Sequence, residues 1–193
     1  MQHRIKLNIP LFSGQMSPPE SPIDPSDVTW ADPFFQALGY LLLQSNELEH
    51  ALLHVYKIVT DKRWEDVEND VREWTIGVLV KRVVAEYEKK FPDGELRQAL
   101  EKMKPTLKEA VDTRNAFVHA RWVFVANEKK MERERLPKGQ AGVREFQLLS
   151  VEDVEKATEV VGGAAEQVME QLYDPAEEAT RATRGPGEIR QRG

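Results

Sequence analysis

Apolar residues between Asp32 and Thr60 recur at steps of three, four or seven positions. This spacing is typical of a helix with one buried face. Asp32 and Pro33 supply the capping and first-turn signals of a helix start. We therefore predict a long core helix over about 32–60. Its apolar positions are Phe35, Leu38, Leu42, Leu48, Leu52, Val55 and Val59.

Two more helices are predicted before residue 120. The charged stretch 63–72 leads into a second helix, which the turn sequence Phe91-Pro-Asp-Gly ends. A third helix runs from Leu96 to about Ala120, with Pro105 either kinking or restarting it. The second helix carries Trp74, Val78, Lys81, Val84 and Tyr87, and the third carries Leu96, Leu100, Met103, Leu107, Val111, Phe117 and Val118.

The pattern then changes to β-branched and aromatic runs at 122–126 and 143–149. A charged, glycine-containing segment separates the runs, which predicts a two-stranded hairpin over about 122–149 with a long solvated tip. Ser150, with Asp153 three residues later, resembles a capping box and begins a fourth helix that extends to about Tyr173. The apolar positions of that helix are Val154, Ala157, Val161, Ala164, Val168 and Leu172.

Both ends of the chain lack a core pattern. Six of the eleven prolines lie in the first 33 residues, so residues 1–32 are predicted to be an extended arm, although the alternation over 3–9 permits a short strand there. Residues 174–193 contain proline, glycine and four arginines balanced by four acids, and we expect a disordered tail. The fold class expected for residues 33–173 is mainly α: a four- to five-helix up-down bundle with a small inserted β-hairpin.

Composition removes several classes of function. The chain has no cysteine, which excludes disulfides, thiol nucleophiles, Cys-ligated zinc and iron–sulfur clusters. A net charge of -6 argues against a general nucleic-acid coat, although residues 96–125 carry six Lys or Arg against three acids. There is no apolar run near 18 residues and no basic-then-apolar leader at Met1, so we expect a cytoplasmic protein without a membrane partner.

A metal site is one candidate chemistry. Glu47-Leu-Glu-His50 is an E-x-x-H pair on one helical face, and His54 follows one turn later. Ferritin-like bundles bind two metals with two such motifs on separate helices, whereas this chain has a single one. We interpret it as a solvated or partly buried helix face and expect no metal and no cofactor.

The stretch Thr113–Trp122 is the most informative one. The apolar line of the third helix continues through Arg114 to Val118, which places an arginine where packing would favour leucine. Asn115 and His119 lie about 40° apart around an ideal helix, whereas Arg114 and His119 lie about 140° apart. The long arginine side chain can nonetheless curl toward a cleft beside the helix. A structural interpretation stays open, in which Arg114 pairs with Glu47 or Glu49 and His119 caps the helix end.

Arg114-Asn115 followed by His119 resembles the R-x4-6-H signature, in its R-N-x-x-x-H form, of HEPN (higher eukaryotes and prokaryotes nucleotide-binding) domains. The resemblance covers residues 33–173. It implies a homodimeric bundle whose two motifs face each other across a shared cleft. Many such proteins are metal-independent endoribonucleases of toxin–antitoxin or other defence systems.

By this resemblance, His119 is a general acid or base, Arg114 stabilises the phosphorane charge, and Asn115 orients the phosphate or the histidine. RNA cleavage suits a group that titrates near neutral pH beside a cation that keeps its proton. Further candidates for substrate binding are Lys108, Arg121 and Trp122. RNA, a second copy of the chain and an antitoxin protein are the partners that we expect. The alternative function is a non-catalytic helical module that binds a protein partner or a nucleotide.

Overall fold

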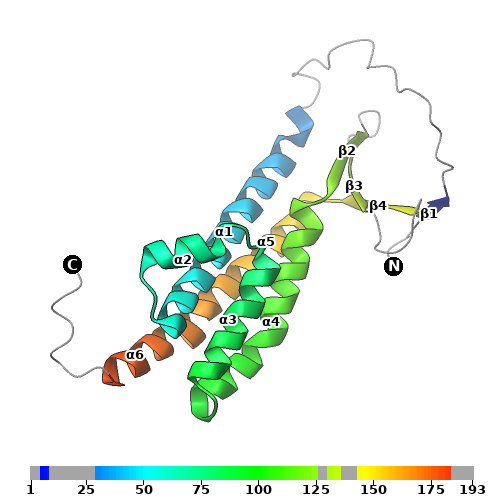
Figure 1. Ribbon diagram of the computed structural model, residues 1–193. Helices are drawn as coiled ribbons and strands as arrows, with labels where there is room; N and C mark the ends of the chain where they lie inside the picture. The colour runs from blue at the N-terminus through cyan, green and yellow to red at the C-terminus, as the bar shows by residue number, and fades with distance from the viewer. Residues whose placement is uncertain (1–4, 9–28, 126–129, 136–142, 184–193) are drawn as a thin grey trace. The chain divides into compact units, whose positions relative to one another are not determined.

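The structure is a computed structural model that describes residues 5–8, 29–125, 130–135 and 143–183 (Figure 1). Its helices confirm the mainly α fold class with a small inserted β element, and none of the described helices is both long and apolar enough to cross a membrane. The elements are β1 (Ile5–Asn8), α1 (Asp32–Thr60), α2 (Trp64–Val71), α3 (Ile76–Lys90), α4 (Gly94–Val118), β2 (Arg121–Val125), β3 (Lys130–Arg135), β4 (Val143–Leu149), α5 (Val151–Val168), a π-helical turn (Met169–Tyr173) and α6 (Asp174–Thr183).

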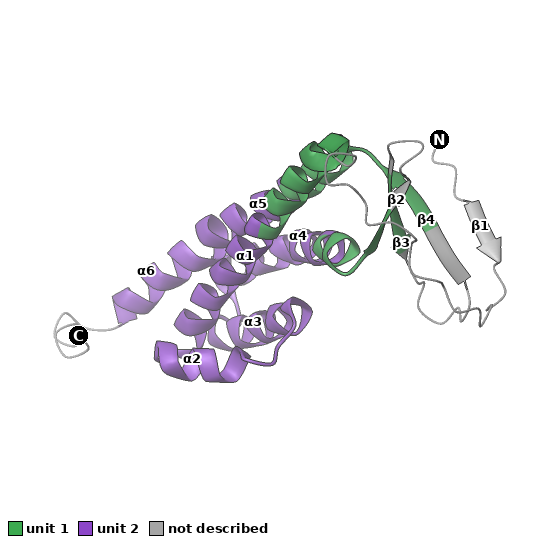
Figure 2. Cartoon of the chain, turned by 90° about the horizontal axis from the view of Figure 1, so that it is seen from above, with its two compact units in different colours: residues 1–42, 114–158 green, residues 43–113, 159–193 purple. Residues whose placement is uncertain are grey.

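The chain divides into two compact units (Figure 2). The sheet unit comprises residues 1–42 and 114–158, and the bundle unit comprises residues 43–113 and 159–193. Helices α1, α4 and α5 contribute residues to both units.

The sheet unit contains an antiparallel sheet with the strand order β1-β4-β3-β2. The predicted hairpin is thus incomplete, because β3 lies between β2 and β4 and was assigned to the solvated tip. Five of the six residues of β3 are charged, so the sequence pattern does not indicate a strand there. In the structure Met131 is buried, and Arg133 pairs with Trp122 of β2. The short strand allowed over 3–9 is present as β1 and pairs with β4. The other residues of the predicted arm up to 28 lie outside the described residues.

The start of α5 shows the predicted capping box. The Ser150 backbone N–H donates to Asp153 Oδ2 at 2.9 Å, and the Asp153 backbone N–H donates to Ser150 Oγ at 3.2 Å. These bonds satisfy N–H groups that have no partner in the first helical turn. The capping box therefore fixes where the chain leaves β4 and enters α5.

The bundle unit has an apolar core that contains a hydrogen bond between residues far apart in the sequence. The hydroxyl of Tyr87 on α3 donates to the Leu172 carbonyl at 3.3 Å, and burial raises the pKa of Tyr87 to about 12. A buried phenol needs such a partner. The larger core side chains of this unit are Leu48, Leu52, Val55, Val67, Val83, Tyr87, Leu100, Met103, Leu107 and Leu172.

The prediction of a disordered tail is wrong for residues 174–183, which form α6. Pro175 lies in the first turn, where the missing N–H removes no helical hydrogen bond. Ala176 and Thr180, one turn apart, are buried, and Arg181 pairs with Glu177 at 2.9 Å. The proline was interpreted as a helix breaker although it stands at a position that helices tolerate. Residues 184–193 lie outside the described residues.

Candidate functional site

The C-terminal end of α4 carries the motif and belongs to the sheet unit. The helix ends at Val118, close to the predicted end at Ala120. The His119 backbone N–H still bonds to the Asn115 carbonyl at 3.4 Å, whereas the Ala120 N–H bonds to the Phe117 carbonyl at 3.4 Å. This shorter closing turn ends the helix and leaves His119 in the turn that follows it.

The three motif side chains lie together. Arg114 Nη1 is 3.1 Å from Asn115 Oδ1 and 3.1 Å from His119 Nε2. Ideal helical geometry separates Arg114 from His119 by about 140°, but His119 lies past the last helical residue and its ring reaches the guanidinium. Because a guanidinium only donates, Nε2 must accept, which places the imidazole proton on Nδ1. His119 thus presents a neutral ring to Arg114.

Arg114 has an unusual environment for a half-buried cation. Its Nε is buried and has no hydrogen-bond partner among the described residues. None of the carboxylates described in the sheet unit forms an ion pair with it. Its two partners, an amide oxygen and a neutral imidazole, leave the positive charge uncompensated. A guanidinium in this state attracts an anion whose oxygens can accept from its planar fork of N–H donors, such as a phosphate.

The residues predicted to bind substrate have partners of their own. The exposed Arg121 guanidinium lies 3.5 Å from the carboxylate of Glu134, which is buried on β3. The Trp122 ring packs edge-on against Phe34 at 5.2 Å between centroids, so its described contacts are those of a core residue. Lys108 belongs to the bundle unit, where its ammonium pairs with Asp112 one turn along α4. The structure therefore groups Arg114, Asn115 and His119 and gives the other three separate contacts.

Arg133 is the residue beside this site that sequence reasoning missed. Its Nη1 donates to the Ala116 carbonyl at 3.2 Å, its guanidinium lies 4.9 Å from the centre of the Phe117 ring, and Nη2 bonds to Gln147. A signal was present in the alternation of Met131 and Arg133, which puts both on one face of a strand. The surrounding charges hid that alternation.

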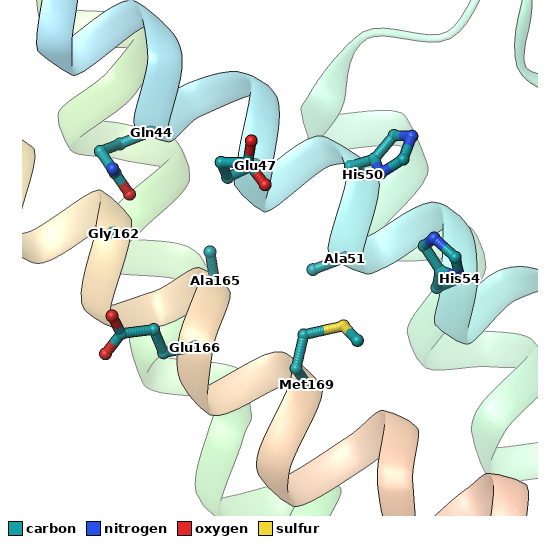
Figure 3. Close-up of a pocket in the computed structure, with 9 residues that line it drawn as sticks. All are labelled: Gln44, Glu47, His50, Ala51, His54, Gly162, Ala165, Glu166 and Met169. Atoms are coloured by element: carbon teal, nitrogen blue, oxygen red, sulfur yellow. The ribbon is translucent and has the colours of Figure 1, made fainter.

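A second candidate is a groove of about 340 Å³ in the bundle unit. It lies between α1 and the C-terminal half of α5 with the first residue of the π-helical turn (Figure 3). Its lining includes the E-x-x-H pair Glu47 and His50, together with His54 and Glu166. An added Cβ at Gly162 would lie 2.6 Å from Gln44 Oε1, so the Gln44 side chain would have to move to admit a larger residue there. Among the described residues, no three His, Cys, Asp or Glu side chains converge as metal ligands.

His54 has aromatic neighbours instead of ligand neighbours. Its ring meets those of His50, Trp64 and Tyr173 edge-on, at 5.2, 4.9 and 5.5 Å between centroids. Burial lowers the pKa of His54, and the charges of His50 and Lys57 lower it further, against an opposing effect of Glu177. These contacts are those of a packed surface cluster.

The motif side chains at the end of α4 thus form the site best suited to chemistry. Comparisons with protein-family models, with curated proteins and with solved structures give no match, so the geometry of Arg114, Asn115 and His119 is the basis for a functional proposal.

Proposed function

We propose that this protein is a HEPN-type, metal-independent endoribonuclease that acts in the cytoplasm as a toxin or anti-phage defence effector. The observation that supports the proposal is the Arg114 guanidinium, which contacts an amide oxygen and a neutral imidazole but no described carboxylate of its unit. Charged groups that are buried in a fold are generally paired with an opposite charge. An arginine that binds phosphate has to keep its charge available.

The proposed reaction uses the three side chains in distinct roles. His119 Nε2 accepts the proton of a ribose 2′-hydroxyl, whose oxygen attacks the adjacent phosphorus. Arg114 stabilises the charge of the five-coordinate phosphorane, which makes a metal ion unnecessary for that task. The bond to the 5′-oxygen then breaks, that oxygen takes a proton from an imidazolium, and the products are a 2′,3′-cyclic phosphate and a 5′-hydroxyl.

The resting contacts suit this sequence of steps. Arg114 Nη1 bonds to His119 Nε2, the atom that has to accept the proton. When a phosphate engages Arg114, Nε2 is released with its lone pair available. Asn115 holds the guanidinium through Oδ1 during this exchange.

A second copy would supply the second histidine. One neutral His119 serves as the base, and a protonated His119 of the facing copy serves as the acid for the leaving oxygen. The sheet unit offers a face for such a partner, since Phe35 and Leu42, two turns apart on the same side of α1, are 45% and 48% exposed. The sequence from Pro33 to Asn46 contains no charged residue, in a chain with net charge -6. In a two-fold interface each patch meets its own copy, so an uncharged patch avoids like-charge repulsion.

The test incubates purified wild type and His119→Ala with total RNA in EDTA. Wild type should cleave, and His119→Ala should lose activity by a factor on the order of 10² to 10⁴. His50→Ala is the matched control, because it removes an exposed histidine of the bundle unit that lies outside the motif. Cleavage by a folded His119→Ala protein at the wild-type rate would refute the catalytic assignment.

Size-exclusion chromatography of the same samples tests the dimer. Wild type should elute as a dimer, and Leu42→Glu should shift it to a monomer because two carboxylates would be buried against an apolar copy. A wild-type monomer that does not cleave RNA would favour the alternative function. In that case the exposed Phe35 and Leu42 would serve to bind a protein partner such as an antitoxin.

A further inference from the structure

The backbone between the two halves of the motif is held by a side chain from the sheet. Ala116 and Phe117 separate Arg114-Asn115 from His119 in the sequence. Arg133 on β3 contacts both of them, through a hydrogen bond of 3.2 Å to the Ala116 carbonyl and a guanidinium position 4.9 Å from the Phe117 ring centre.

The hydrogen bond from Arg133 gives the Ala116 carbonyl a donor that the helix does not supply. In a continuing helix the Ala116 carbonyl would accept from the N–H of Ala120, but that N–H bonds to the Phe117 carbonyl instead. Arg133 Nη1 supplies the missing donor. Its positive charge also lies at the C-terminal end of α4, where the helix dipole favours a cation.

Arg133 is itself fixed in place. Its Nη2 bonds to the Gln147 side chain on β4, and its backbone stands opposite Trp122 of β2. Phe117 is buried beneath the guanidinium, at 8% exposure. A side chain with this many restraints loses little further entropy when it holds the helix end.

We propose that Arg133 is a positioning residue, which holds the end of α4 so that His119 stays within reach of Arg114. The inserted sheet is then part of the functional unit and does more than present a surface to a partner. The effect of Arg133 on activity rests on the proposed function, but its effect on the position of His119 does not.

The experiment measures the imidazole NMR signals of His119 in the full chain, assigned by their disappearance in His119→Ala. Arg133→Met keeps an apolar stem over Phe117 and removes every donor. It should shift or broaden the His119 signals at a temperature well below its melting transition. Arg133→Lys, which restores a charge and one donor to the Ala116 carbonyl, should return the signals part of the way to their wild-type positions.

Arg82→Met is the matched control. Arg82 also lies over an aromatic ring, 5.6 Å from the centre of Trp74, but in the bundle unit. This variant loses a similar contact and should leave the His119 signals in place. Unchanged His119 signals in a folded Arg133→Met protein, with a melting temperature lowered as in Arg82→Met, would overturn the proposal.

Activity gives the second readout. Arg133→Met should lower kcat on RNA by a factor on the order of 10 to 10², with a smaller change in KM, because misplacing a catalytic group costs rate more than binding. If Arg133→Met does not fold, Gln147→Leu replaces it, since it removes one restraint on Arg133 and should shift the His119 signals less but in the same direction. If wild type shows no cleavage, the proposed function fails, while the NMR result still decides the positioning role.

Discussion

The two ends of α4 carry two arginine clusters of opposite character. Near the start of the helix, in the bundle unit, Arg97 forms ion pairs with Glu88 at 2.7 Å and with Glu101 at 2.6 Å. Lys104 bonds to the same two carboxylates at 2.7 and 2.8 Å. At the other end, in the sheet unit, the partners of Arg114 are the neutral side chains of Asn115 and His119.

The difference lies in what compensates the charge. The hydrogen bond from Lys104, followed by that from Arg97, lowers the pKa of Glu88, which is the sign of a cluster whose charges are already matched. Arg114 has a buried Nε without a partner among the described residues and no matching acid in its unit. The comparison teaches that the residue type does not reveal the role of an arginine, whereas its partners do. The arginine with acidic partners fits a role in stability, and the neutral partners of Arg114 are the basis for proposing that it binds an anion.

The largest effect that tests this comparison is expected for Arg114→Met. It should lower RNA cleavage by a factor on the order of 10² to 10³, because in the proposed mechanism it removes the charge that stabilises the phosphorane. Its melting temperature should stay near that of wild type or rise slightly, since a half-buried guanidinium with an unsatisfied N–H is lost. Cleavage assays and thermal melts on the same preparation measure both.

Arg97→Met is the matched variant at the other end of the helix and should behave in the reverse way. It removes two ion pairs that are partly solvated, worth about 0–1 kcal/mol each, so the melting temperature should fall by a few degrees. RNA cleavage should be unchanged at temperatures where the variant is folded. If Arg114→Met instead melts several degrees lower and cleaves normally, Arg114 is structural and the comparison fails.

Much of the fold was predictable where apolar periodicity is unbroken. All six apolar positions assigned to the fourth helix are buried, and Ser150 and Asp153 form the expected capping box. The helix around Pro105 continues without a restart. In these segments local spacing and burial agree, so the sequence carries the information by itself.

The phase of α1 was predicted incorrectly in its first half. Phe35 and Leu42 were expected in the core but are exposed, and the buried line runs through Phe34, Ala37 and Leu41. The line is continued by Ser45, which is 3% exposed. A buried serine breaks the apolar pattern, and the surrounding leucines occupy both faces. On α3, similarly, Val78 is exposed at 38%, and the neighbouring Leu79 is buried. Only tertiary packing could settle these phases.

The site was predictable in its members but not in its geometry. Arg114, Asn115 and His119 were found from the motif, yet an ideal helix puts Arg114 and His119 on different faces. Their contact depends on the helix ending at Val118, and on the turn that follows. Arg133 comes from a strand whose charge pattern resembles a loop. Contacts between distant segments decide such features, and a single sequence does not display them.

A smaller effect sharpens the comparison by turning from arginines to histidines. The exposed His119 faces a guanidinium, whereas His54 lies among aromatic rings. Burial lowers the pKa of His54, and the charges of His50 and Lys57 lower it further, against the opposing effect of Glu177. In the unfolded chain histidine titrates at about 6.5, so the unfolded chain binds more protons than the folded chain just below that pH. The free energy of unfolding should decrease as the pH falls from 7.5 through 6.5 toward the lowered pKa, and it should stay level above that range.

Urea unfolding of wild type and His54→Gln at pH 7.5, 6.5 and 5.5 measures this decrease. The variant should lose much of it, because the side chain responsible no longer titrates. His50→Gln is the closest control, since it removes only one of the charges that depress the His54 pKa and should retain more of the pH dependence. If His54→Gln keeps the full wild-type decrease, the acid sensitivity originates elsewhere, and the enclosure of His54 by Trp64 and Tyr173 has no energetic consequence for its protonation.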